Sequence, residues 1–438
     1  QFMKDIVAGL IVAIIALPLS IALAIASGVN PEQGLYTAII AGFFISFLGG
    51  SRVQIGGPTA AFVVIIYGII AEHGLAGLII ATLMAGVMLI VMGLLHFGDL
   101  IKFIPKTITI GFTLGIAIGI IVGQIKDFLG LNMGPVPAEF LEKMIAYGHN
   151  IGSISYITLG IGALAILIQI FWQKISKKIP GSLVAILVTT LLVAYCKLPV
   201  KTIGDLYTIK SGLPSFSMPS LSFSLVREMM LPAFTIAILA AIESLLSAVV
   251  SDGMIGSKHK SNAELIGQGI GNIMSALFGG IPATGAIART AANVKNGGRT
   301  PVAGMVHALT LLLILLFLMP YASYIPMSCL AGILIIVGYN MSGWRTFVRM
   351  VKTAPKSDIV VLIITFLLTL FFDLVIAIEF GMVLAAFLFL KRMSDIAEVR
   401  QWTYRDPMEE DKLSEEVDLK YVPKNTIVYE IFGALFFG

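Results

Sequence analysis

Charged residues are scarce in this chain of 438 residues. Only 12% of its positions are charged, whereas 58% are hydrophobic. This composition leaves too little polar surface to cover a water-soluble globule, and it therefore excludes a soluble domain of ordinary make-up. The solvent that the composition fits is a lipid bilayer, and no nucleic acid is expected as a partner.

Cysteine and histidine are scarce as well, with two and five residues. Cys196 and Cys329 lack the spacing of a metal or redox pair, and the histidines are scattered along the chain. No nucleophile with a neighbouring base is apparent either. We therefore expect neither an enzyme, nor a bound cofactor, nor a structural metal.

Long uncharged runs make up most of the chain, for example Ile6–Pro31, Gly74–Leu95 and Leu265–Ala288. Each exceeds the roughly 20 residues that a helix needs to cross the hydrocarbon layer, and none alternates in polarity as a barrel strand would. The run at Ile6 reads as a first span, because no cleavable signal is visible.

Clusters of lysine and arginine indicate the orientation, since short cytoplasmic loops collect basic residues. With the N-terminus inside, all the main clusters fall on the cytoplasmic side of a scheme of 14 segments. We therefore expect a multi-pass protein of the inner (plasma) membrane with both termini in the cytoplasm. The basic and apolar segment Trp344–Lys356 is predicted to be an interfacial helix on the cytoplasmic leaflet.

The predicted fold is an all-α polytopic membrane protein whose 14 segments form two sets of seven. The third segment of each set is unusually short. The first set is predicted near residues 6–28, 34–49, 58–71, 75–95, 105–125, 153–172 and 181–196. The second set is predicted near residues 232–251, 262–279, 286–294, 300–319, 326–339, 357–372 and 375–391.

Both short segments follow a Gly-Gly break with a proline, Gly56–Thr59 in the first set and Gly279–Gly285 in the second. Because seven is odd, two such sets in succession have opposite orientations in the membrane. This predicts a 7+7 inverted repeat, with halves at about 5–200 and 230–392 and two half-helices near its centre.

The character of the sequence changes after the last predicted segment. Residues 1–392 are expected to form the transport domain, and the charged residues 393–425 a cytoplasmic linker. The run Thr426–Ile431 is predicted to be the first strand of a further domain that would begin at 426–438.

The paired breaks predict a cavity, since irregular backbone at membrane depth is tolerated only inside protein or against water. Pro58 and Pro282 suit the first position of a helix. Two opposed helix starts, with the charge of Arg289 nearby, would bind an anion. The alternative is that the breaks are ordinary kinks of membrane helices.

Glu243 is predicted near the bilayer centre, about 17 Å into its segment at 1.5 Å per residue. Ser247 lies one turn further on the same helix face. The pair could bind sodium, or the glutamate could take up a proton. Alternatively, Glu243 is a structural carboxylate paired with Arg289 or with backbone amides. Gln268 and Asn272 could line the cavity or bond helix to helix, and the second is favoured for a lone polar residue in a span.

These residues resemble the sulfate permease (SulP) family of anion transporters, which includes the animal anion exchangers and prestin. The similarity covers residues 5–438 and rests on motifs at 16–18, 31–36, 49–52, 56–59, 262–272 and 288–290. The resemblance implies a core and a gate domain, a homodimer, and a STAS domain of which 426–438 would be the start. It also implies a substrate site formed by Pro58, Thr59, Ala60, Ala286, Ile287, Ala288 and Arg289, against Ala22 and Leu23.

The chain is also similar to cyanobacterial sodium-dependent bicarbonate transporters, in which the positions of Glu243 and Ser247 carry Asp and Thr and bind sodium. We expect an elevator-type symporter of a small inorganic oxyanion, with sulfate first and a proton or sodium as the coupling ion. Sodium-dependent bicarbonate symport, an uncoupled anion exchanger or channel, and dicarboxylate transport remain open. A nucleobase carrier of similar architecture is disfavoured by the motifs at 34–36 and 288–289.

Overall fold

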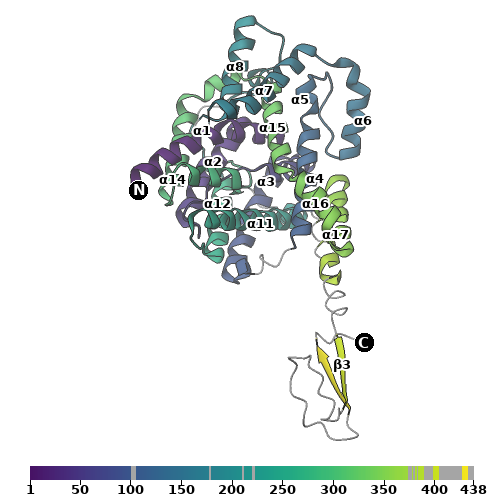
Figure 1. Cartoon of the computed structure of the whole chain (residues 1–438). Coiled ribbons are helices and arrows are strands. Elements are labelled where there is room, and N and C mark those ends of the chain that lie inside the picture. Colours follow the sequence, from purple (N-terminus) through teal and green to yellow (C-terminus); the bar gives the residue numbers. More distant parts are fainter. Residues whose placement is uncertain are drawn as a thin grey trace.

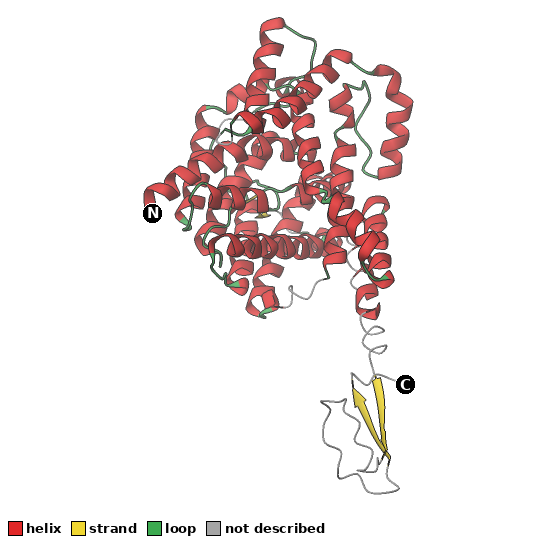
Figure 2. Cartoon of the chain, in the orientation of Figure 1, coloured by secondary structure: helices red, strands yellow, loops and turns green. Residues whose placement is uncertain are grey.

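The structure is a computed structural model of the chain, and it is built almost wholly of helices (Figure 2). It describes residues 1–99, 105–176, 179–209, 212–219, 222–372, 377, 380–381, 383–388, 398–403 and 427–432.

The first half of the chain contains one short strand and a series of helices. Its elements are α1 (Phe2–Ala26), α2 (Pro31–Leu48), β1 (Gly56–Gly57), η1 (Ala60–Phe62), α3 (Val63–Leu94), η2 (Phe97–Asp99), α4 (Lys106–Gly123), α5 (Ile125–Leu129), α6 (Phe140–Asn150), η4 (Ile151–Ser153), α7 (Tyr156–Ile175), α8 (Gly181–Cys196) and α9 (Ile203–Leu206).

After one short helix, the second half also has two long helices, a two-residue strand and then further helices. Its elements are α10 (Phe223–Glu228), α11 (Met230–Ile255), α12 (Ser261–Leu277), β2 (Thr284–Gly285), α13 (Ile287–Lys295), α14 (Val302–Phe317), η5 (Met319–Tyr324), α15 (Met327–Met341), α16 (Trp344–Thr353), α17 (Lys356–Phe371), β3 (Glu398–Thr403) and β4 (Ile427–Phe432).

The short third segments of both sets are present. In the first half, α3 is broken at Gly74, where φ is 63°, so the helix that starts beside β1 ends there and a second one continues. In the second half, α13 has nine residues. At 1.5 Å per residue it extends about 14 Å, less than half of the roughly 30 Å hydrocarbon layer.

Fewer helices meet the length criterion for a membrane span than the 14 predicted segments. Among the described residues, five helices are long and apolar enough to cross a membrane, or six if the bent pair Phe140–Ser153 and Tyr156–Trp172 forms one span. The remaining apolar helices are shorter, so this criterion does not confirm 14 spans. Most of the last predicted segment, 375–391, lies outside the described residues.

The contacts that a helix of one half makes with the other half are repeated by its counterpart in the other half. α1 packs on α14, and its counterpart α11 packs on α3. In the same way, α2 contacts α14 while α12 contacts α3, and α17 contacts α4 while α7 contacts α15. This reciprocal pattern is what an inverted repeat produces.

The helices also fall into two groups by their contacts. One comprises α1, α2, α3 and α11 to α14, and the other comprises α4, α5, α7, α8 and α15 to α17. Figure 1 shows α2, α12 and α14 on one side of the molecule, and α4, α16 and α17 on the other. The assignment of these two groups to a core and a gate domain stays a prediction.

Two strands near the C-terminal end pair antiparallel, with Glu398 opposite Phe432. β4 confirms the strand predicted at the end of the chain, whereas β3 was not predicted and lies within the expected linker. The assignment of 426–438 to a STAS domain stays a prediction.

Glycines allow a close helix crossing in the first group, between α3 and α12. A Cβ on Gly86 would lie 2.7 Å from the carbonyl oxygen of Gly269, and a Cβ on Gly269 would lie 2.5 Å from that of Gly86. In a bilayer, where apolar side chains gain little by leaving lipid, such close backbone contact is a main source of helix association.

We therefore expect Gly86→Ala to destabilise the protein by about 1–3 kcal/mol through overpacking. The measurement is the thermal unfolding midpoint of the purified protein in detergent. Gly160→Ala on α7 is the matched control, because nothing lies within 4 Å of a Cβ there. Equal midpoints for the two variants would show that this crossing does not limit stability.

Candidate functional site

The two Gly-Gly breaks meet at the centre of the repeat. β1 and β2 pair antiparallel, with Gly56 opposite Gly285 and Gly57 opposite Thr284. The chain leaves β1 into η1 and α3, and it leaves β2 directly into α13. Two helix starts from distant parts of the sequence are thereby brought side by side, as the paired breaks predicted.

The second half-helix holds the loop that precedes β1. The backbone N–H of Ile55 donates to Thr290 Oγ1 at 3.1 Å, and the Ile55 carbonyl accepts from the N–H of Ala286 at 2.9 Å. Further along α13, Asn293 Nδ2 donates to the Val53 carbonyl at 2.9 Å. The position of each half-helix is therefore fixed by the other.

Side chains of α2 and α12 hold the second loop, before β2. Asn272 donates to the Ala283 carbonyl and accepts from the Ala283 N–H, both at 2.8 Å. Thr37 Oγ1 accepts from the N–H of Ile281 at 2.7 Å. These bonds satisfy backbone groups that have no helical or sheet partner. Asn272 thus bonds a loop to a helix, rather than helix to helix as expected.

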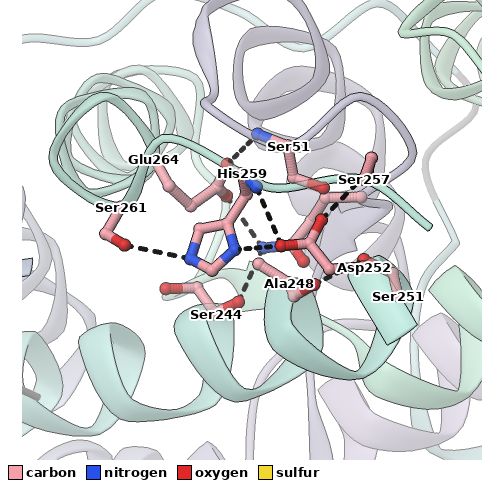
Figure 3. Close-up of polar contacts among 10 residues, drawn as sticks. Ser51, Ser244, Ala248, Ser251, Asp252, Ser257, His259, Ser261 and Glu264 are labelled. Carbon is pink, nitrogen blue, oxygen red and sulfur yellow. Dashed lines mark hydrogen bonds and ion pairs between the residues drawn. The ribbon is translucent and has the colours of Figure 1, made fainter. Parts of the chain in front are cut away.

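Glu264 on α12 is a completely buried carboxylate that anchors the first loop. It accepts from the N–H of Ser51 at 2.9 Å, from Gln54 Nε2 at 2.8 Å and from Gln268 Nε2 at 2.8 Å. Figure 3 shows Ser51 directed at Glu264 from the neighbouring loop. A buried charge is tolerated when several donors surround it, so Glu264 holds this loop against α12.

A chain of polar contacts connects α11 to α12 (Figure 3). His259 Nδ1 lies 2.7 Å from Asp252 Oδ2, and Ser261 Oγ lies 3.0 Å from His259 Nε2. The backbone N–H of His259 also donates to Asp252 at 2.8 Å. The contacts fix the turn between the helix that carries Glu243 and the helix that carries Glu264.

Arg289 is the buried positive charge of the site, with 4% of its surface exposed. Its Nη2 donates to the carbonyl of Pro58, while Nη1 has no hydrogen-bond partner among the described residues. A Cβ on Gly57 would lie only 2.7 Å from Nη1, and Gly57 has a φ of 149°. The guanidinium thus occupies the space that a side chain at position 57 would fill.

The start of α13 presents backbone donors. Its first helical bond is from the N–H of Thr290 to the carbonyl of Ala286, at 2.8 Å. The N–H groups of Ile287, Ala288 and Arg289 therefore have no intrahelical acceptor. Because the side chain of Ile287 is 42% exposed, this first turn is open on one side. Free N–H groups at a helix start attract anions.

Glu243 and Ser247 lie one turn apart on α11 and connect to different half-helices. Thr59 Oγ1 donates to Glu243 Oε2 at 3.1 Å, and Ser247 Oγ donates to Thr290 Oγ1 at 3.2 Å. Among the described residues Glu243 forms no ion pair within 4 Å, so the pairing with Arg289 weighed above is absent. Side-chain oxygens of Glu243 and Ser247 on α11 and of Thr59 and Thr290 on the half-helices therefore lie where the half-helices contact α11.

The remaining predicted site residues are apolar. Ala22 and Leu23 of α1 are buried in the same hydrophobic cluster as Ala60. Ala286 is buried at the start of α13, and α1 packs against this helix. The structure therefore brings the elements of all the predicted substrate residues together.

Sequence reasoning missed several residues that shape the site, chiefly Glu264, Thr290, Asn293 and Thr37. A signal existed for Glu264, because it is the last charged residue before a long uncharged run. Thr290 directly follows Arg289 in the sequence. The other two carry no pattern that separates them from any polar residue in a membrane helix.

Comparison with known proteins assigns these elements to a family. The profile of the sulfate permease family matches residues 2–365. The Bacillus subtilis protein named "Putative sulfate transporter YvdB" is 43% identical over 440 residues, covering 100% of this chain and 81% of the relative. The bicarbonate transporter BicA of Picosynechococcus is 33% identical over 447 residues, covering 99% of this chain and 78% of the relative.

Solved structures share the architecture. The transmembrane domain of a cyanobacterial bicarbonate transporter, BicA, superposes with a TM-score of 0.78 at 31% identity, covering 86% of this chain and 97% of that one. The overall structure of SLC26A9 superposes with a TM-score of 0.82 at 19% identity, covering 93% and 68%. The second likeness concerns the fold alone.

We expect Glu264→Gln to destabilise the protein by about 1–3 kcal/mol. The NH2 group of the new side chain cannot accept a hydrogen bond, so at least one of the buried donors that now bond to Glu264 would lose its acceptor. Thermal unfolding in detergent measures the loss. Glu142→Gln, an exposed acid on α6, is the control. If both variants unfold at the same temperature as the parent chain, Glu264 does not anchor the loop before β1.

Proposed function

The chain belongs to the sulfate permease family, and we propose that it is a secondary transporter that carries sulfate by symport with a proton or a sodium ion. Because it belongs to this family, the chain is a membrane transporter of anions. The substrate, the coupling ion and the transport movement are parts of the proposal.

The observation that carries the proposal is the uncompensated charge of Arg289 beneath two helix starts. Among the described residues no carboxylate lies within 4 Å of its guanidinium. Its charge adds to the positive ends of both half-helices, and the free N–H groups of α13 supply directional donors. A small oxyanion, with acceptors on all sides, matches this arrangement.

In this proposal, Pro58, Thr59 and Ala60 bind the anion from the first half-helix, and Ala286, Ile287, Ala288 and Arg289 bind it from the second. Ala22 and Leu23 of α1 close the site with apolar surface. Because the half-helices are bonded to each other and to α2, α11 and α12, they would move as one body. An elevator movement of this group against α4, α7, α15 and α17 then provides alternating access.

Glu243 is the proposed coupling residue. It reaches the first half-helix through Thr59, so a change in its charge acts directly on the anion site. Protonation or sodium binding there would remove the repulsion between the carboxylate and an incoming anion. Ion and anion would thus travel together.

We also propose the setting of this transporter. It is an inner-membrane homodimer with both termini in the cytoplasm, in which residues 1–392 form the transport domain. Residues 393–425 are the linker, and 426–438 begin a STAS domain.

A second candidate is sodium-dependent bicarbonate symport. The hydroxyls of Thr59, Ser247 and Thr290 lie along α11 beside Glu243, and sodium prefers such oxygen ligands. The similarity to BicA supports it as well. Uncoupled exchange or channel flux and dicarboxylate transport are outcomes that the same experiments distinguish.

We expect Arg289→Gln to weaken sulfate binding by about 10- to 100-fold, since a buried charged donor contributes about 1.5–3 kcal/mol. Equilibrium binding of labelled sulfate to the detergent-purified protein measures this. Arg227→Gln, an exposed arginine on α10, should bind as the parent chain does. Unchanged affinity in Arg289→Gln would remove Arg289 from the anion site.

We expect Glu243→Gln to abolish gradient-driven sulfate accumulation in proteoliposomes while downhill sulfate exchange persists, because a permanently neutral side chain cannot couple. Proton and sodium gradients are imposed separately, and Glu228→Gln on α10 is the control.

Normal accumulation by Glu243→Gln would refute the coupling role. Sodium-driven bicarbonate uptake by the parent chain would favour the second candidate. Flux that is indifferent to both gradients would indicate an exchanger or a channel.

A further inference from the structure

The connection between α15 and α17 is a helix too short to span a membrane. α16 has ten residues, about 15 Å at 1.5 Å per residue, and none of its residues is buried. The break between α15 and α16 falls at Gly343, whose φ of 55° interrupts the helical backbone. The apolar helices α15 and α17 both pack on α4, and α16 joins the end of the one to the start of the other, so it lies at one end of this group of helices.

One part of α16 contacts protein. Phe347 lies edge-on against Phe366 of α17, with ring centroids 5.4 Å apart. Another part is apolar and exposed. Trp344, Val348 and Val351 are 42%, 40% and 36% exposed, and their spacing of four and three residues places them on one face.

The basic residues form a third face. Arg345, Arg349 and Lys352 are exposed and follow the same spacing of four and three residues. At about 100° per residue they fall within an arc of about 60°, directly beside the apolar face. None of them is within 4 Å of a carboxylate in the described part of the chain. The guanidinium of Arg345 lies 5.5 Å from the ring centroid of Trp344.

The helix equivalent to α16 in the first half is α6, and it lacks the excess of basic residues that α16 has. α6 precedes α7 as α16 precedes α17, and it also exposes apolar side chains, Leu141 and Ile145 among them. Yet its lysine and its glutamate, Lys143 and Glu142, cancel in charge. Lys143 also lies over the ring of Tyr67 rather than free at the surface.

We infer that α16 is a binding surface for anionic phospholipid headgroups, with Trp344, Val348 and Val351 inserted among the acyl chains and Arg345, Arg349 and Lys352 bound to headgroup phosphates. The long basic side chains lie at the border of the apolar face, where they reach the headgroup level. The surface belongs to the group of helices that includes α4, α15 and α17, so bound lipid would hold that group in the leaflet.

Fluorescence quenching by brominated lipids tests this inference directly. The chain has three tryptophans, so Trp172→Phe and Trp402→Phe leave Trp344 as the only reporter. The full chain is reconstituted into vesicles that contain brominated phosphatidylglycerol or brominated phosphatidylcholine. We expect Trp344 to be quenched by both lipids, with at least about a fivefold preference for phosphatidylglycerol, because each basic residue near an anionic surface contributes on that order.

The deciding variant is Arg345→Gln/Arg349→Gln/Lys352→Gln, in which the preference should fall to about one. The matched control removes three exposed basic residues elsewhere, as Lys106→Gln/Lys258→Gln/Lys260→Gln, and should keep the preference. Both variants must elute as the parent does in size-exclusion chromatography. A preference shared by the parent and the deciding variant would overturn the inference, as would quenching that is equal for the two lipids or absent. In those cases the basic residues would serve only to orient the chain.

Discussion

The structure depends on one constraint, that backbone polar groups at membrane depth have no water to bond with. Two loops break the helical backbone at the centre of this protein, and each broken end must find partners inside the protein. The solution is reciprocal: β1 pairs with β2, Ile55 bonds to Thr290 and Ala286, and Asn293 reaches back to Val53. Because each break satisfies the other, neither half-helix can be positioned without its counterpart.

The donors that remain after this pairing define the chemistry. The first turn of α13 keeps its N–H groups free, and the guanidinium of Arg289 lies against Gly57 with one nitrogen unbonded. Carboxylates near this charge are held away from it. Glu264 is saturated by Ser51, Gln54 and Gln268, and Glu243 is bonded to Thr59. The net result is a positive site with one neighbouring acid, which is consistent with the ion-coupled anion transport proposed above.

The sequence predicted the fold well where local signals repeat. The paired Gly-Gly breaks, 223 residues apart, predicted both the short helices and their meeting. Arg289, Glu243 and Ser247 were identified because polar residues are conspicuous in uncharged helices. The residues that hold the two breaks in place could not be predicted, since Thr290, Asn293 and Thr37 act through contacts with loops more than 200 residues away. Spacing along one helix also suggested that Glu243 and Ser247 act as a pair, whereas each bonds to a different half-helix.

The central claim is that the anion binds where the two half-helix starts meet. A crystal structure of the chain with selenate, an isostere of sulfate, tests it, because the anomalous scattering of selenium identifies the anion without ambiguity. The account predicts a single strong anomalous peak within hydrogen-bond distance of the N–H groups of Ile287 and Ala288, between η1 and α13. A peak at any other place in the transport domain, with none between these helix starts, would contradict it.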